Sequence, residues 1–269
     1  MKFTFRAICL WLCFASTAFG LVHCSIEDRI ISLIPGEKGQ IEIPLYNPDP
    51  QPAAVRVYLE DWERAEDGTQ LFYPAGTLPN SAAGQLKLAE STIVLEPKQS
   101  GKLILEVQVP HDQRGSRTAI LFVEGGSLPA PPQAEGDKMN ISIRALLRYG
   151  IKIYVVARGT EEPGTKITGC SLENPRDGKI PVSIQLENYG NVHLSYKGRL
   201  EVRTLDGEVL EKVSLQPFSI LPKAKRSISG QVSVPAAGKY LLLAVLDYGG
   251  QTLLAAEAPF EIRGEASGK

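Results

Sequence analysis

The sequence predicts an all-β fold made of two immunoglobulin-like β-sandwich domains in tandem. Apolar and polar residues alternate in many short runs, and Gly, Pro, Asn and Asp separate these runs. No segment shows the 3.6-residue periodicity of a helix, so strands separated by turns are the expected elements. The chain has 269 residues, of which 43% are hydrophobic and 22% are charged. This composition is typical of a globular protein with one or two domains, each with a hydrophobic core.

The first half of the chain contains five short runs with strand-like alternation. They are QIEIPLYN (40–47), AAVRVYLEDW (53–62), STIVLEP (91–97), GKLILEVQVP (101–110) and RTAILFVEG (117–125). Turns are predicted at 34–39, 47–52 and 66–69, where Pro fixes φ and Gly supplies positive φ. Trp62 ends the second run, and we expect this large aromatic residue to pack between the two sheets.

The run ISIRALLRYGIKIYVV (141–156) is about three times as long as an ordinary strand of 5–6 residues. One face carries Ile141, Ile143, Ala145, Leu147, Tyr149, Ile151, Ile153 and Val155, and the other carries Ser142, Arg144, Arg148 and Lys152. A long strand with an uncovered edge invites pairing with another chain. Alternatively, the strand is long because it crosses from the first domain into the linker, with its last apolar residues in the core.

A second series of strands follows a loop at 125–140 and a Gly/Pro-rich linker at 157–166. Its runs are 179–188, 197–215, 226–235, 238–250 and 257–264. Asp206-Gly207 predicts a hairpin turn within the second of these runs. We therefore predict a signal peptide at 1–20, a first domain at 21–158 and a second domain at 159–269.

The N-terminus has the pattern of a cleaved export signal. Lys2 and Arg6 precede an apolar run at 7–14, and Ala18-Phe19-Gly20 offers small residues for cleavage near Gly20. The apolar run is too short for a membrane span of about 20 residues, and no later segment approaches that length. We expect a mature protein without a membrane span, either periplasmic or secreted.

Four cysteines are present, and two of them, Cys9 and Cys13, lie in the predicted signal peptide. Cys24 and Cys170 remain in the mature chain, where an oxidising compartment permits one disulfide between the domains. Two free thiols are the alternative, which we favour because the sequence gives no distance between the two residues.

Composition and motifs exclude several classes of function. The formal net charge is -1 and no basic run is present, so nucleic acid is not an expected partner. His23, His111 and His193 lack the spacing of metal ligands, so no metal and no cofactor are expected. No G-x-S-x-G motif occurs, and we do not expect an enzyme.

The order of elements in the first domain resembles that of the periplasmic pilus-assembly chaperones of the PapD type. The resemblance is carried by IPGEKGQIEIPLYNPDPQPAAVRVYLEDW, IVLEPKQSGKLILEVQVP, RTAILFVEG and the closing strand ISIRALLRYGIKIYVV. It implies two immunoglobulin-like domains at an angle. It also implies a function, the lending of the last strand of the first domain to an incomplete pilin subunit.

The same resemblance implies specific site residues and a protein partner. Ile143, Ala145 and Leu147 match the donated apolar side chains, and Lys152 matches the basic residue that anchors the client's C-terminal carboxylate. Arg29, in EDRIISLIPGEKG, is the candidate for the first-strand arginine that assists it. The implied partner is an exported β-rich subunit such as a pilin-like client. A structural or adhesive module that binds a cell-surface partner is the alternative.

Overall fold

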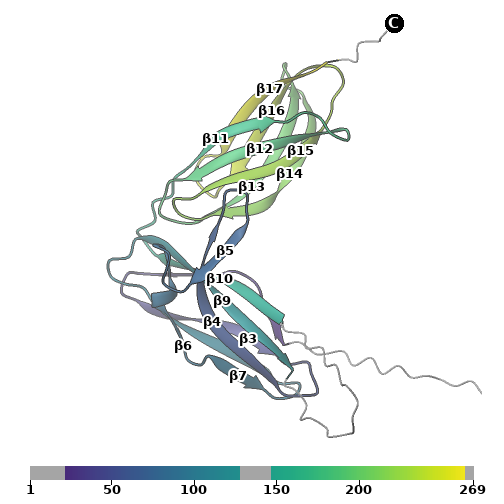
Figure 1. Ribbon diagram of the computed structural model, residues 1–269. Helices are drawn as coiled ribbons and strands as arrows, with labels where there is room; N and C mark the ends of the chain where they lie inside the picture. The colour runs from purple at the N-terminus through teal and green to yellow at the C-terminus, as the bar shows by residue number, and fades with distance from the viewer. Residues whose placement is uncertain (1–21, 128–146, 264–269) are drawn as a thin grey trace, which may run out of the picture.

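The computed structural model describes residues 22–127 and 147–263, in which strands are joined by turns and loops (Figure 1). The first ten strands are β1 (His23–Cys24), β2 (Arg29–Leu33), β3 (Lys38–Tyr46), β4 (Ala53–Arg64), β5 (Gln70–Pro74), β6 (Leu86–Leu88), β7 (Thr92–Leu95), β8 (Ser100–Gln108), β9 (Gly115–Ser127) and β10 (Leu147–Ala157). The other seven are β11 (Thr165–Leu172), β12 (Lys179–Asn188), β13 (Leu194–Thr204), β14 (Val209–Ile220), β15 (Lys225–Ser233), β16 (Gly238–Asp247) and β17 (Leu254–Ile262). Within these two ranges the helical structure is a single 3-10 turn at Ala83–Gln85. The all-β prediction is confirmed.

Strands β1–β10 form a first sandwich of two sheets. One sheet has the order β1-β3-β8-β6, and the other has the order β2-β10-β9-β4-β5, with β7 also paired to β4. Strand β2 runs parallel to β10, whereas the other pairs are antiparallel. Period-2 alternation turns Ile43, Val55, Leu105 and Ile153 inward, and their side chains are at most 1% exposed in the shared core.

Strands β11–β17 form a second sandwich, with sheets β11-β12-β15 and β14-β13-β16-β17. Ile184, Leu200 and Leu242 are 0% exposed between these sheets. The predicted hairpin is present, because β13 and β14 are antiparallel neighbours and Gly207 has a φ of 91° in their turn. Residues 158–164 connect β10 with β11.

The two domains contact each other through a third apolar cluster and a hairpin. Trp62, Phe122 and Tyr154, on the outer face of the first domain, pack with Leu221 of the second. The β4–β5 hairpin reaches the second domain, where Ser227 N donates a hydrogen bond to Glu66 O at 2.7 Å (Figure 1).

The expected packing of Trp62 between the two sheets is wrong. Trp62 is 1% exposed, but it lies on the outer face of β4 with Tyr58, whereas Val55 and Val57 face the core. Successive residues of a strand point to opposite faces, which places the even-numbered residues of β4 outside the sandwich. The second domain provides the cover that buries the indole ring.

Both cysteines of the described chain are free. Cys24 and Cys170 lie in different domains, and each is partly buried. Burial raises the pKa of the Cys24 thiol to about 11 and also raises the pKa of Cys170, so both thiols are protonated at neutral pH.

Candidate functional site

The two halves of β10 differ in their neighbouring strands. Strand β9 pairs with β10 along its whole length, from Leu147 opposite Gly125 to Ala157 opposite Gly115. Strand β2 pairs only with residues 153–157. Within the ranges that the structure describes, residues 147–152 therefore have a strand on one side and an open edge on the other. The backbone groups along such an edge can pair with an added strand.

The inward-facing side chains of β10 are partly exposed at the start of the strand and buried towards its end. Leu147 and Tyr149 are partly exposed, whereas Ile151, Ile153 and Val155 are 0% exposed in the core. The end of the strand is thus an ordinary core element, and its beginning is an edge with accessible apolar side chains. Of the three apolar side chains predicted to be donated to the client, the structure describes Leu147, whereas Ile143 and Ala145 lie outside the described residues.

Lys152 projects from the opposite face of β10, into the space between the domains. Its side chain is 20% exposed, and Nζ lies 3.8 Å from Oδ1 of Asp28 and 5.4 Å from the ring centroid of Trp62. A separation of 3.8 Å is too long for a hydrogen bond, so this ion pair leaves the N–H donors of Lys152 available for a closer anion.

Arg29 does not join Lys152. It is the register partner of Ile153, whose side chain is in the core, and neighbouring residues of paired strands share a face. Lys152 is one position away from Ile153 and therefore points to the other face. The Arg29 guanidinium instead donates hydrogen bonds to Glu27 O at 3.0 Å and to Ser25 Oγ at 2.9 Å.

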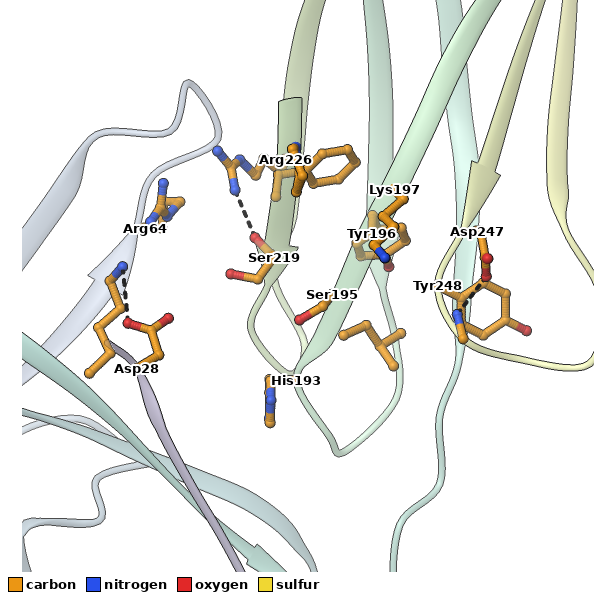
Figure 2. Close-up of a pocket in the computed structure, with 15 residues that line it drawn as sticks. Asp28, Arg64, His193, Ser195, Tyr196, Lys197, Ser219, Arg226, Asp247 and Tyr248 are labelled. Atoms are coloured by element: carbon orange, nitrogen blue, oxygen red, sulfur yellow. Dashed lines mark hydrogen bonds and ion pairs between the residues drawn. The ribbon is translucent and has the colours of Figure 1, made fainter. Parts of the chain in front are cut away.

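A cavity of about 640 Å³ opens between the two domains beside Lys152. Figure 2 shows side chains from both domains around it. Its charged lining residues are Asp28, Arg64 and Lys152 of the first domain and Lys197, Arg226 and Asp247 of the second. Basic side chains outnumber acidic ones, so the cavity favours an anion. The sequence analysis missed Arg64 and Arg226, because the local sequence pattern does not indicate which residues of the two domains lie close together.

The aromatic rings of His193 and Tyr154 stack where the domains meet, and His193 also lines the cavity. The ring centroids lie 4.1 Å apart, and the backbone N–H of His193 donates a hydrogen bond to Ser116 Oγ at 2.9 Å. Burial lowers the pKa of His193 to about 4 and raises the pKa of Tyr154 to about 12. Both side chains are neutral at pH 7, which leaves the lysines, arginines and aspartates to set the charge of the cavity.

Within residues 22–127 and 147–263, no group of three or more His, Cys, Asp or Glu side chains is placed to hold a metal ion. These residues also contain no helix with the length and hydrophobicity needed to cross a membrane.

No protein-family model matches this sequence, and no curated protein matches it by sequence. Solved structures do match. The class 5 fimbriae chaperone CfaA aligns with 88% of this chain and 98% of its own at 14% identity, with a TM-score of 0.51. A chaperone and tip-adhesin complex of CFA/I fimbriae also matches, at 14% identity over 91% of this chain and 100% of its own, with a TM-score of 0.47. The CsuC–CsuE chaperone complex of Acinetobacter baumannii matches at 15% identity over 89% of this chain and 98% of its own, with a TM-score of 0.46.

The likeness to CfaA shows that this chain has the two-domain immunoglobulin-like fold of a fimbrial chaperone. The predicted resemblance to pilus-assembly chaperones is therefore confirmed at the level of fold. At 14% identity the match does not identify the function, which depends on the site.

Proposed function

We propose that this protein is an exported, non-enzymatic chaperone that binds unfinished β-rich subunits, such as pilin-like clients, by lending them the open edge of β10. The observation that carries the proposal is that residues 147–152 pair with β9 but not with β2. This edge lies beside a cavity with an excess of basic side chains. The fimbrial-chaperone fold supports the same function.

Client binding on this edge combines backbone pairing with apolar contacts. A client strand beside residues 147–152 gains hydrogen bonds from their free N–H and C=O groups, as in other cases of strand addition. Leu147, together with Ile143 and Ala145, donates its side chain to the incomplete core of the client. Burying a leucine or isoleucine side chain fully contributes about 1.5–3 kcal/mol.

Lys152 supplies a charge anchor at the end of the open edge. We propose that its ammonium group binds the C-terminal carboxylate of the client, because it is partly buried and its present partner, Asp28, is 3.8 Å away. Charge-assisted hydrogen bonds of this kind are roughly twice as strong as neutral ones. Arg29, the other predicted anchor residue, lies on the inner face of the sheet and takes no part in this mechanism.

Export to the periplasm belongs to the same proposal. The N-terminal pattern of Lys2, Arg6, an apolar run and Ala18-Phe19-Gly20 supports it, since a fimbrial chaperone has to meet its clients after their export. An adhesive module, the alternative function, does not need the open edge, so the following test separates the two.

The test compares aspartate at two positions on the same face of β10. The probe is a library of dodecapeptides with alternating apolar and polar residues and a free C-terminal carboxylate, the acid library. Leu147→Asp should lower the free energy of unfolding by no more than about 0.5 kcal/mol, as for surface changes, and abolish peptide retention. Ile151→Asp should cost several kcal/mol, because it buries an unpaired carboxylate in the core.

Val94→Asp is the matched control, because Val94 is 56% exposed on β7, which pairs with β4 and not with β10. This variant should fold and retain the acid library like the wild type. Strand lending would be contradicted if a folded Leu147→Asp variant retained the peptides as well as the wild-type protein does. It would also be contradicted if Leu147→Asp and Ile151→Asp lowered the free energy of unfolding equally.

A further inference from the structure

Two arginines from different domains contact the same turn of the β4–β5 hairpin. Arg64 Nη1 donates a hydrogen bond to Gly68 O at 3.4 Å. Arg226 packs against the same glycine so closely that a Cβ added to Gly68 would lie 3.4 Å from Arg226 Nη2. The bond from Ser227 N to Glu66 O at 2.7 Å holds β15 and this turn together. Both guanidinium groups line the cavity beside Lys152 (Figure 2).

Neither arginine has a carboxylate partner among the described residues. Arg226 Nη1 donates to Ser219 O at 2.7 Å, but the Nε atoms of both Arg64 and Arg226 are buried without a hydrogen-bond partner. Burial and the nearby charge of Arg64 lower the pKa of Arg226. Two like charges with unsatisfied donors destabilise each other, and an anion between them relieves both effects.

Lys152 differs from the arginines because a carboxylate already stands near it. Asp28 Oδ1 lies 3.8 Å from Lys152 Nζ and offsets part of its charge. Arg64, Lys197 and Arg226 are the basic lining residues without an ion-pair partner among the described residues. Arg64 and Arg226 both contact Gly68, which brings their two charges together. A guanidinium group also matches the two oxygens of a carboxylate better than an ammonium group does.

We propose that Arg226 and Arg64 bind the terminal carboxylate of the client together with Lys152, and so take the role first assigned to Arg29. This inference rests on the proposed chaperone function. It adds that the second domain contributes directly to the client site, because Arg226 belongs to β15. A client bound in this way contacts both domains through a single carboxylate.

The experiment measures how strongly the protein prefers a free C-terminus. The acid library is compared with an amide library of the same sequences, in which each peptide ends in a neutral amide. The wild type should retain the acid library at least tenfold better. Arg226→Gln and Arg64→Gln should each lower this preference at least fivefold and leave retention of the amide library unchanged.

Two further variants separate charge from folding. Arg176→Gln is the matched control, since Arg176 belongs to the second domain and its side chain is 73% exposed, and it should keep the full preference. Arg226→Lys keeps the positive charge and should keep part of the preference for the acid library. Arg64→Gln lies in the other domain, and it still tests the arginine assignment if Arg226→Gln fails to fold.

The outcomes distinguish this inference from the function on which it rests. An unchanged acid preference in folded Arg226→Gln and Arg64→Gln overturns the assignment of the two arginines. Equal retention of both libraries by the wild type also overturns it, while strand lending by β10 stands. Retention of neither library contradicts the chaperone function and the arginine assignment together.

Discussion

Acidification from pH 7 to pH 4 should destabilise the protein through His193, where the two domains meet. The imidazole stacks on Tyr154, its Nδ1 is buried without a hydrogen-bond partner, and burial lowers its pKa from 6.5 to about 4. As the pH falls below 6.5, the unfolded chain gains a proton at His193 that the folded protein does not accept. The unfolded state then binds more protons, so stability falls with pH until about pH 4.

The size of this effect follows from the pKa difference, 6.5 minus about 4. Each pKa unit corresponds to 1.36 kcal/mol, so His193 should remove about 3 kcal/mol of stability between pH 7 and pH 4. The contribution is absent above pH 6.5, where the imidazole is neutral in both states, and it stays constant below pH 4.

Denaturant unfolding of the wild type and of His193→Gln, measured from pH 7.5 to pH 4, checks this value. Glutamine stays neutral, so the carboxylates of the protein titrate in both curves and their effect cancels in the difference. The wild type should lose about 3 kcal/mol more than the variant over this range. Parallel curves would refute the linkage to His193, whatever the offset between them at pH 7.

Three further predictions concern the division of the chain and its N-terminus. Residues 22–158 and 159–263, produced separately, should each keep β-type circular dichroism and a thermal transition, because each half has its own core; disorder in either half would contradict this. Trp62 fluorescence should shift to longer wavelength in the first half, which lacks Leu221. Intact-mass analysis of the exported protein should show the loss of about the first 20 residues, and a full-length cytoplasmic product would exclude the signal peptide.

Alternation predicted the well-packed strands closely and missed those in which it fails. The run 179–188 coincides with β12. Strand β5 was missed, because four of its five residues are exposed and it lacks an inward apolar face. Strand β11 was missed as well, because a register shift between Ile167 and Gly169 interrupts its period.

The candidate site was predictable only where it depends on a single strand. Period 2 alone separates Lys152 from the core-facing Ile151 and Ile153. Whether Arg29 shares the face of Lys152 depends on the register between β2 and β10, which a one-residue step reverses. The arrangement of Arg64 and Arg226 depends on how the two domains pack, and the local sequence pattern contains no signal for it.

Amide hydrogen exchange of residues 147–152 tests the central claim most directly. In the free protein, the amides of this stretch that point away from β9 should exchange rapidly, because no described strand pairs with that edge. Binding of a single peptide chosen from the acid library should slow their exchange by at least tenfold. The amides of 153–157, which already lie between β2 and β9, should change little. Bound peptide with unchanged exchange at residues 147–152 would show that β10 does not lend its edge.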